Sequence, residues 1–503
     1  MSTLRQYPLG ARVPDSEHAM CVSLPTLKDV VGYEERKPRV MRALRSGYPR
    51  FISHHYVERL AERLRESEFG LGGRQIFLTQ SVRGARLLAD FVGAEADPRV
   101  AEAQGCHFVH TVATETVWRR GMAFLQHTGY GISSRFAEDR LIALGEAIDA
   151  QREPSVESGG SFEVRYEMAR YLGLGRADSV LVCNSGMNAF FAAFQAARDV
   201  QRPLGRRIWV QLGWLYLDTG EILRKFTLPD ERVEIVTDLR DLDRLERLFA
   251  AHGGEIAGVI TETPTNPLLQ TVDLPRVYQL CQANGALLIA DPTLGSFWNV
   301  SPIPFADIVV TSLTKYTAGE GDVMAGALVI NPDSPMLLDL LSRAVAYHDP
   351  LYKRDLARLT YELADAPELV GRVNASTPEV VRWLEGHSKV RRVHWAYSDD
   401  SAQHYTTLAG SDQAAGAVFS VEFDLPLAKV YDRLPMAKGP SFGTHFTMAC
   451  PFMYLAHYRL ASTKEGRREL LSHGLNPDLI RFSLGTESPD EIIAALAKAI
   501  GRQ

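Results

Sequence analysis

Two patterns of hydrophobic positions alternate through the middle of the chain. Short apolar runs rich in Val, Ile and Leu are separated by segments in which apolar residues recur every three or four positions. The first pattern predicts buried strands and the second predicts amphipathic helices. The predicted strands are residues 179–183, 208–211, 258–261, 287–290, 308–311 and 325–330, and the predicted helices are residues 162–172, 188–198, 241–251 and 274–284. Strands and helices that alternate in this way predict an α/β fold with a mainly parallel sheet covered on both faces.

The flanking regions carry weaker patterns. Residues 57–65 have the spacing of an amphipathic helix, and residues 75–78 follow a glycine turn as a possible strand. A Pro-, Ser- and Gly-rich stretch at 151–162 is typical of a loop or boundary. A helical stretch begins near residue 335, and residues 378–503 mix strands and helices, as in a smaller α+β domain. We therefore expect an N-terminal extension (residues 1–125), a large domain (126–355) and a C-terminal small domain (356–503).

Composition narrows the class of protein. Apolar residues make up 46% of the 503 residues and charged residues 23%, and the net charge of −6 gives no reason to expect nucleic acid as a partner. No apolar run approaches the roughly 18 residues of a membrane span, so we expect no membrane association and a cytoplasmic location. The cysteines are far apart and form no CxxC pair, which argues against a disulfide framework or a metal site. They are Cys21, Cys106, Cys183, Cys281 and Cys450.

Two strand ends carry candidate chemistry. The strand at 308–311 ends in small hydroxyl residues followed by Lys315, and the strand at 287–290 ends in Asp291. Pyridoxal 5'-phosphate (PLP) requires such a pair, because the amine forms a Schiff base with its aldehyde and the carboxylate keeps its pyridine nitrogen protonated. Most lysines are solvated surface charges, but the spacing and the strand context favour the cofactor. In an open parallel sheet, ligands bind outside the carboxyl ends of the strands, where both residues fall.

Further residues at strand ends could complete this site. Ser185, Gly186 and Met187 join a strand to a helix, so their backbone amides and the helix dipole could hold a phosphate; a plain helix cap is the alternative. Ser312 and Thr314 could add hydroxyl donors to the same phosphate.

Three more positions are candidates, and two of them, Tyr216 and Arg481, each allow a second interpretation. Tyr216 could stack on the cofactor ring or be a half-buried core aromatic. The turn at 262–267, which contains Asn266, places two prolines at a strand end. Arg481 lies within an apolar strand, where it could grip an amino acid carboxylate or form an internal salt bridge.

Taken in order, these motifs resemble the cystathionine γ-synthase family, the Cys/Met-metabolism group of fold type I PLP enzymes. The matching runs are Ser185-Gly-Met187, Glu262-Thr-Pro-Thr-Asn266-Pro-Leu-Leu, Asp291-Pro-Thr293, Thr311-Ser312-Leu-Thr-Lys315-Tyr and Leu479-Ile-Arg481-Phe-Ser-Leu-Gly485. They span about three quarters of the chain, from about residue 129 to the C-terminus.

The resemblance implies roles for these residues. Lys315 would carry the cofactor, Asp291 would face the pyridine nitrogen, and Tyr216 would stack on the ring and take part in catalysis. The phosphate would be held by Ser185, Gly186, Met187, Ser312 and Thr314. Asn266 and Thr293 would add cofactor contacts, and Arg481 with Ser441 would bind the substrate carboxylate.

The N-terminal part is similar to the longer, fungal-type members of this family. Residues 23–33, Gly47-Tyr-Pro-Arg-Phe51 and residues 127–135 carry that likeness. Shorter members instead have a Tyr-x-Arg followed by Gly-Asn-Pro, which contacts the phosphate across a dimer interface. We expect that Tyr-x-Arg to be absent here, with Arg135 contacting the cofactor and Tyr130 the substrate.

The resemblance implies γ-replacement or γ-elimination on an activated homoserine-type amino acid, such as an O-acylhomoserine or S-adenosylmethionine. Lys315 would move the α-proton, and loss of the γ-substituent would leave a vinylglycine-type intermediate that a nucleophilic co-substrate attacks. The leaving group and nucleophile stay open. An aminotransferase or β-lyase on the same fold, and a non-enzymatic degenerate homologue, are the alternatives. A homodimer or homotetramer is implied by the family alone.

Overall fold

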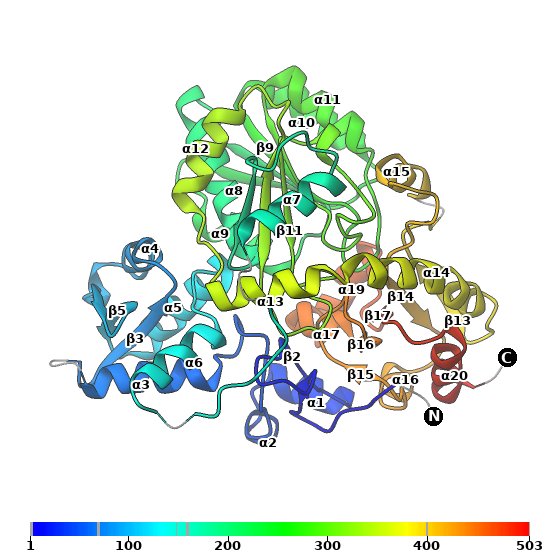
Figure 1. Ribbon diagram of the computed structural model, residues 1–503. Helices are drawn as coiled ribbons and strands as arrows, with labels where there is room; N and C mark the ends of the chain where they lie inside the picture. The colour runs from blue at the N-terminus through cyan, green and yellow to red at the C-terminus, as the bar shows by residue number, and fades with distance from the viewer. Residues whose placement is uncertain (1–3, 68–70, 147, 157–159, 399–400, 502–503) are drawn as a thin grey trace.

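The computed structural model describes residues 4–67, 71–146, 148–156, 160–398 and 401–501. Its largest unit is a seven-stranded sheet with strand order β6-β12-β11-β10-β9-β7-β8 (Figure 1). The strands are β6 (Val180–Cys183), β7 (Ile208–Leu212), β8 (Arg232–Val236), β9 (Ile256–Glu262), β10 (Leu287–Asp291), β11 (Ile308–Ser312) and β12 (Gly326–Ile330). Only β12 pairs antiparallel with its neighbours in this sheet. The predicted α/β fold with a mainly parallel sheet is therefore confirmed.

Helices cover both faces of the large sheet because its strands are apolar on both sides. In β7, Ile208 and Val210 pack into one core cluster, whereas Trp209 points into the other. The first face is covered by α7 (Ser161–Tyr171), α10 (Leu242–His252), α11 (Leu274–Asn284) and α13 (Lys353–Leu363). The second is covered by α5 (Glu115–Thr128), α8 (Gly186–Gln201), α9 (Leu217–Phe226) and α12 (Leu337–Tyr347). This burial on both faces is what a parallel sheet requires.

Two elements of the large sheet were absent from the sequence prediction. Strand β8 lies at the sheet edge, and its alternating Arg, Val, Glu and Ile side chains lack the continuous apolar run of the inner strands. Helix α9 contains Gly220, which weakens helical propensity. The other predicted helices and strands of this region fall within two or three residues of the observed ends. The predicted loop at 151–162 includes residues 157–159, which lie outside the described residues.

The C-terminal region forms a second sheet with strand order β13-β14-β17-β16-β15. Its strands are β13 (Val390–His394), β14 (Val418–Phe423), β15 (Ala437–Lys438), β16 (Met448–Cys450) and β17 (Ile480–Ser483). Its helices are α14 (Ala366–Glu385), α15 (Ala402–Leu408), α16 (Leu427–Tyr431), α17 (Phe452–Ala456), α18 (Tyr458–Ala461), α19 (Lys464–Ser472) and α20 (Pro489–Ile500). This smaller sheet with its helices is the expected α+β unit.

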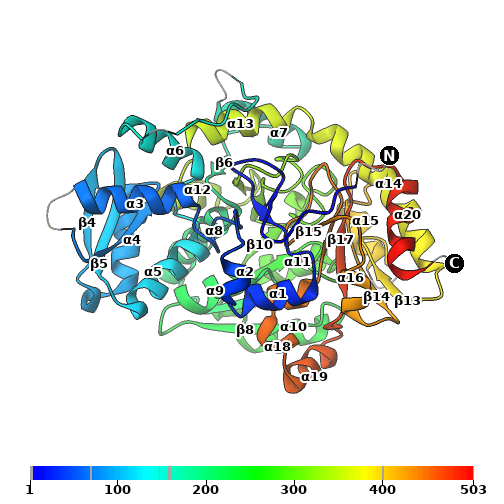
Figure 2. The same cartoon turned by 90° about the horizontal axis from the view of Figure 1, so that it is seen from below.

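The N-terminal region divides into two parts. Helices α3 (His55–Ser67), α4 (Val82–Val92) and α6 (Ser134–Ala143) accompany a sheet of β3 (Arg74–Thr79), β5 (Cys106–Val112) and β4 (Arg99–Ala103). The preceding residues form β1 (Arg12–Val13), β2 (Cys21–Val22), α1 (Leu27–Glu34) and α2 (Pro38–Met41). Figure 2 shows this first segment, in dark blue, running between the three-stranded unit and the C-terminal sheet.

The first segment is part of the folded body. Leu24, Val30 and Val40 are fully buried in the same core cluster as the C-terminal sheet. Helices α5 and α13 run through residues 125 and 355, and the domain boundaries at those positions stay predictions. Across the described ranges, no helix has both the length and the apolar character needed to cross a bilayer.

Candidate active site

A cavity of about 760 Å³ opens at the carboxyl ends of the large sheet's parallel strands. Its wall also includes residues of the N-terminal segment and of the C-terminal sheet. Nine of the predicted site residues line it: Gly186, Met187, Tyr216, Asn266, Asp291, Thr293, Ser312, Lys315 and Arg481. The chain therefore brings together at one place residues that are up to 295 positions apart in the sequence, from Gly186 to Arg481.

Lys315 follows β11 and reaches into the cavity, and no carboxylate of the residues that the structure describes pairs with it. Its Nζ donates to Ser441 Oγ at 2.7 Å and lies 5.1 Å from the ring centroids of both Tyr48 and Phe442. Burial lowers the pKa of the Lys315 amine, and the nearby Arg481 charge adds to this effect. An amine that is more readily deprotonated is a better nucleophile and a better base.

The next residue, Tyr316, has a φ of +62°. This left-handed conformation is costly for a large side chain and concentrates at functional sites. Here it turns the chain sharply just after the lysine.

Asp291 ends β10 directly beside Glu262 at the end of β9. Burial raises the pKa of Asp291 to about 6, although hydrogen bonds from Thr293 act in the opposite direction. Burial and the neighbouring Asp291 charge raise the pKa of Glu262 well above its ordinary value. The Glu262 carboxylate accepts a hydrogen bond from the backbone N–H of Tyr216. Asp291 is thus a half-buried acid that meets no cation among the described residues, and a protonated ring nitrogen would complete it.

The start of helix α8 forms the opposite end of the cavity. Ser185 caps this helix, because its Oγ accepts a hydrogen bond from Asn188 N at 3.1 Å. A Cβ on Gly186 would lie 2.9 Å from Ser312 Cβ, so only glycine allows this close approach. The side chains of Ser185 and Thr314 are absent from the cavity wall, and Thr314 Oγ1 bonds the backbone of Ala325. Backbone amides and the helix dipole are the groups that remain for an anion.

Arg481 lies on β17 and is 2% exposed. Its Nη1 donates to Asn266 Oδ1 at 3.1 Å, and its Nη2 donates to the carbonyls of Pro440 and Ser441. No carboxylate of the described residues pairs with it, so the internal salt bridge that the sequence left open does not form there. A buried guanidinium of this kind is suited to binding a ligand carboxylate.

The N-terminal segment supplies cavity residues that the sequence prediction did not include, among them Tyr48 and Arg50. Arg50 forms an ion pair with Asp218 and donates to Tyr216 Oη at 2.9 Å. Burial raises the pKa of the Tyr48 phenol, but the charges of Lys315 and Arg50 outweigh burial, so this pKa lies below its ordinary value. The chain thus contains a Tyr-x-Arg sequence, although no Gly-Asn-Pro follows it. The signal was present as Tyr48-Pro49-Arg50, about 80 residues before the segment in which it was sought.

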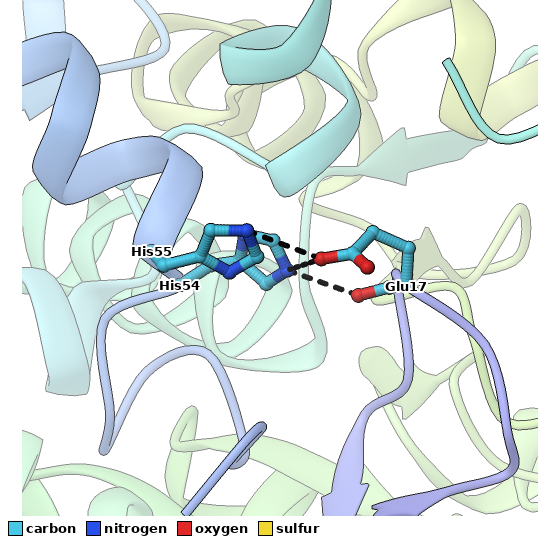
Figure 3. A group of neighbouring side chains, drawn as sticks. All are labelled: Glu17, His54 and His55. Carbon is cyan, nitrogen blue, oxygen red and sulfur yellow. Dashed lines mark hydrogen bonds and ion pairs between the residues drawn. The ribbon is translucent and has the colours of Figure 1, made fainter. Parts of the chain in front are cut away.

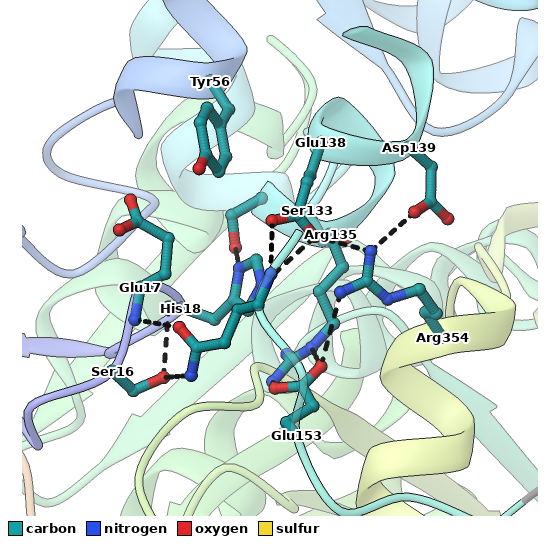
Figure 4. A network of polar contacts seen from close by, with 12 residues as sticks. Ser16, Glu17, His18, Tyr56, Ser133, Arg135, Glu138, Asp139, Glu153 and Arg354 are labelled. Carbon is teal, nitrogen blue, oxygen red and sulfur yellow. Dashed lines mark hydrogen bonds and ion pairs between the residues drawn. The ribbon is translucent and has the colours of Figure 1, made fainter. Parts of the chain in front are cut away.

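Arg135, which was predicted to contact the cofactor, lies elsewhere. It is fully buried and pairs with Glu153 at 2.6 Å, Asp355 at 3.0 Å and Asp322 at 3.4 Å, a group that we call the Arg135 cluster. Figure 4 shows Arg135 beside Glu153 within a polar network that also contains Arg354 and His18. Three carboxylates already neutralise the guanidinium, so it has no charge left for a phosphate. The structure replaces the predicted role with a structural one.

Tyr130, which was predicted to contact substrate, is also absent from the cavity wall. It is fully buried, stacks on Phe124, and donates its hydroxyl hydrogen to the carbonyl of Tyr347. Burial raises the pKa of its phenol far above the ordinary range. Tyr130 is therefore a core residue here, and the predicted substrate contact is corrected.

The residues of the cavity fit PLP. Within the described part of the chain, Lys315 has no counterion and Asp291 no cation, and both lie with the start of helix α8 in one cavity. These are the contacts that the aldehyde, the ring nitrogen and the phosphate need. Tyr216 also lines the cavity, and its hydroxyl oxygen accepts a hydrogen bond from Arg50. The sequence placed these groups at separate strand ends, and the fold joins them.

Comparison with known proteins gives consistent matches. A model of the Cys/Met metabolism PLP-dependent enzyme family matches residues 168–501. An L-2-amino-4-chloropent-4-enoate dechlorinase/desaturase of Streptantibioticus cattleyicolor is 40% identical over 482 residues, which is 95% of each chain. A cystathionine gamma-synthase of Neurospora crassa is 26% identical and covers 98% of each chain.

Among solved structures, a cystathionine gamma synthase from Xanthomonas oryzae pv. oryzae in complex with cystathionine has a similar fold. Its TM-score is 0.56 at 22% identity, over 71% of this chain and 91% of that chain. At this identity the likeness supports the fold alone.

Proposed function

This chain belongs to the Cys/Met metabolism family of PLP-dependent enzymes, and we propose that it removes or replaces a substituent at the γ-carbon of an amino acid. The observation that carries the proposal is a set of charged groups in one cavity, half-buried or buried, that have no charged partner among the described residues. Lys315, Asp291 and Arg481 form no ion pair with any of the described residues, yet all three face the same space. Buried charges of this kind are costly unless a ligand completes them.

Each of these residues has a distinct part in the proposed reaction. Arg481 holds the substrate carboxylate, which orients the α-carbon toward Lys315. PLP, when bound, accepts the electron pair that the α-carbon releases. Lys315 Nζ takes the α-proton and delivers it again, and Ser441 Oγ, 2.7 Å away, fixes the position of that nitrogen. Tyr216 lines the same cavity, with its backbone N–H bonded to the Glu262 carboxylate.

Elimination is the favoured outcome. The relative that is 40% identical over almost the whole chain is named as a dechlorinase and desaturase, whereas the cystathionine synthase is 26% identical. The cavity wall also includes apolar residues that fit a small uncharged γ-substituent, beside charged ones such as Glu34, Arg36 and Glu221; the apolar residues are Met41, Phe51, Ile52, Phe442, Phe452 and Leu455. In this outcome the substrate loses the elements of HX from the β- and γ-carbons, where X is the γ-substituent. Replacement by a nucleophilic co-substrate is the second candidate.

The test offers several γ-substituted amino acids to the purified enzyme in deuterated water. The panel contains 2-amino-4-chloropent-4-enoate, O-acylhomoserines and S-adenosylmethionine, each with and without cysteine, and the products are identified by mass spectrometry. We expect release of the γ-substituent and deuterium at both the α- and β-carbons. Exchange at the α-carbon alone, with a new amino acid formed from an oxo acid, would instead establish an aminotransferase. Release of pyruvate would establish a β-lyase.

The assembly and the location are part of the same proposal. We infer a homodimer or homotetramer from the family resemblance. All five cysteines are buried and free, which is compatible with the reducing cytoplasm that we propose as its location.

A further inference from the structure

The chain between residues 17 and 54 forms a loop whose two ends meet. Ser46 Oγ donates to the carbonyl of Ala19 at 2.9 Å, and His54 Nε2 donates to the carbonyl of Glu17 at 2.9 Å. These contacts close the base of a loop, which we call the N-terminal loop. Several of its residues line the cofactor cavity. Whatever fixes the base of the loop therefore also fixes part of the cavity wall.

Three side chains that can bind a metal converge at this base. His54 and His55 both point toward Glu17 (Figure 3). His55 Nε2 lies 3.2 Å from Glu17 Oε1, and His54 Nε2 lies 3.7 Å from the same oxygen. One ligand atom from each residue lies within 4.8 Å of the other two. In a tetrahedral zinc site, bonds of about 2.0–2.1 Å place neighbouring ligand atoms about 3.4 Å apart. The two measured distances lie on either side of this value.

The group is enclosed on one side and open on the other. The side chains of His54 and Glu17 are 6% and 19% exposed, whereas that of His55 is 52% exposed. An ion can therefore reach the group from the side of His55. Burial lowers the pKa of His54 to about 3 and also lowers the pKa of His55. Both rings are thus neutral near pH 7, which is the form of imidazole that binds metals.

His54 has hydrogen-bond partners in the metal-free protein. Its Nε2 carries the ring hydrogen, because this nitrogen faces the Glu17 carbonyl, and its Nδ1 accepts from the backbone N–H of Tyr56 at 3.2 Å. Binding of a metal at Nε2 moves the ring hydrogen to Nδ1 and gives up the contact with Tyr56. No net proton is released in this exchange.

Arg12 is the competitor for Glu17. Its Nη2 donates to Glu17 Oε1 at 2.7 Å, and its side chain is 27% exposed. A partly exposed ion pair of this kind contributes little free energy, so a divalent ion can replace the guanidinium. His18 lies nearby but is occupied, because its Nδ1 is 2.9 Å from Ser134 Oγ and its Nε2 is 3.6 Å from Glu138 Oε2.

We propose that Glu17, His54 and His55 bind one divalent transition-metal ion such as Zn²⁺, with water in the fourth position. The ion joins the two ends of the N-terminal loop, and Arg12 turns toward solvent when it binds. Two imidazoles and a carboxylate are common ligands of such ions. The site is separate from the cofactor cavity, and the inference makes no assumption about PLP or substrate.

The test titrates metal into the full-length protein without an affinity tag, after treatment with a chelator and dialysis. Calorimetry follows Zn²⁺, and visible absorbance follows Co²⁺, whose bands are intense in a four-coordinate site. We expect one ion per chain. His55→Ala and Glu17→Gln each remove a ligand and should weaken binding by at least about tenfold. Arg12→Gln removes the competitor and should strengthen binding about twofold to fivefold.

The controls separate this site from unspecific binding. His473→Ala, at an exposed histidine elsewhere, should leave the affinity unchanged. Zn²⁺ should raise the unfolding midpoint of the wild type and raise that of His55→Ala less. Unfolding curves without metal verify that each variant folds.

Three results would overturn the inference. The wild type could bind no metal, or Co²⁺ could show only the weak bands of the six-coordinate aqua ion. Binding could also be the same in His55→Ala and Glu17→Gln as in the wild type. The last two outcomes would indicate an adventitious ion only. None of these measurements requires turnover, so their outcome is independent of the reaction proposed above.

Discussion

The cofactor cavity and the Arg135 cluster both contain charged side chains inside the protein. The charge of Arg135 is paired, whereas Lys315 and Arg481 have no charged partner among the described residues. In the cluster, Arg135 meets three carboxylates within 3.4 Å. In the cavity, Lys315 and Arg481 meet only neutral oxygen atoms of the described residues. Because an unpaired buried charge is unfavourable, its persistence indicates a missing ligand, whereas a paired charge indicates a structural role.

Two arginines illustrate this difference. Arg135 and Arg481 are both almost inaccessible to water. Burial alone therefore does not identify a binding residue; the absence of a partner does. Four substitutions test this difference between paired and unpaired charges.

Replacing Lys315 with alanine removes the amine that joins the cofactor to the protein. We expect complete loss of the visible absorbance of lysine-bound PLP and a decrease in kcat of about a thousandfold or more. Absorbance spectra and single-turnover kinetics measure both effects. Lys464→Ala, at an exposed lysine, should change neither. Turnover close to wild type would remove Lys315 from the reaction.

Replacing Arg135 with alanine should affect stability and leave PLP binding unchanged. Asp355 would lose its arginine, and Asp322 and Glu153 would keep only Arg358 and Arg354, at a cost of about 3–5 kcal/mol in the free energy of unfolding. Urea unfolding measures this loss, and PLP titration below the unfolding transition gives the affinity. A stable variant that has lost PLP would reverse the comparison.

Asp291→Asn should lower kcat by about a hundredfold to a thousandfold, because the ring nitrogen loses its charged partner. The same substitution should raise the free energy of unfolding of the PLP-free protein, whereas it lowers kcat. The pKa of Asp291 is raised to about 6 by burial, so the folded state holds its proton where the unfolded state has lost it. The contribution of Asp291 to wild-type stability therefore falls as pH rises from about 4 to 6.

The asparagine variant lacks this fall, since its side chain does not ionise. Unfolding curves of both PLP-free proteins between pH 4 and 7 test the sign. A variant whose stability relative to wild type decreases with rising pH would contradict the unpaired state of Asp291.

The smallest effect is expected at an exposed pair. Arg119 and Glu115 lie 2.7 Å apart on α5, with side chains 74% and 69% exposed. Arg119→Ala should cost less than about 0.5 kcal/mol, because water and salt screen the pair. Unfolding at low and high salt checks this value. A loss comparable with that of Arg135→Ala would show that pairing, independent of burial, sets the cost.

The sequence predicted the site residues whose positions follow from local patterns. Lys315 and Asp291 each follow an apolar strand, and parallel strands bring their carboxyl ends to one edge of the sheet. Arg135 was misassigned because its partners are remote: Asp322 is 187 residues away. No local sequence pattern indicates a contact between residues so far apart in the chain. Tyr48 and Arg50 depended on the path of a loop whose base is closed by tertiary contacts, which sequence periodicity does not encode.

The closed N-terminal loop has a practical consequence for protein engineering. Trimming a recombinant gene so that translation starts at residue 55 would preserve all strands of the three larger sheets. It would nevertheless delete part of the wall of the reaction chamber, together with five of its polar side chains, Tyr33, Glu34, Arg36, Tyr48 and Arg50. Such a shortened product should crystallise as a recognisable relative and yet stay colourless when vitamin B6 is supplied.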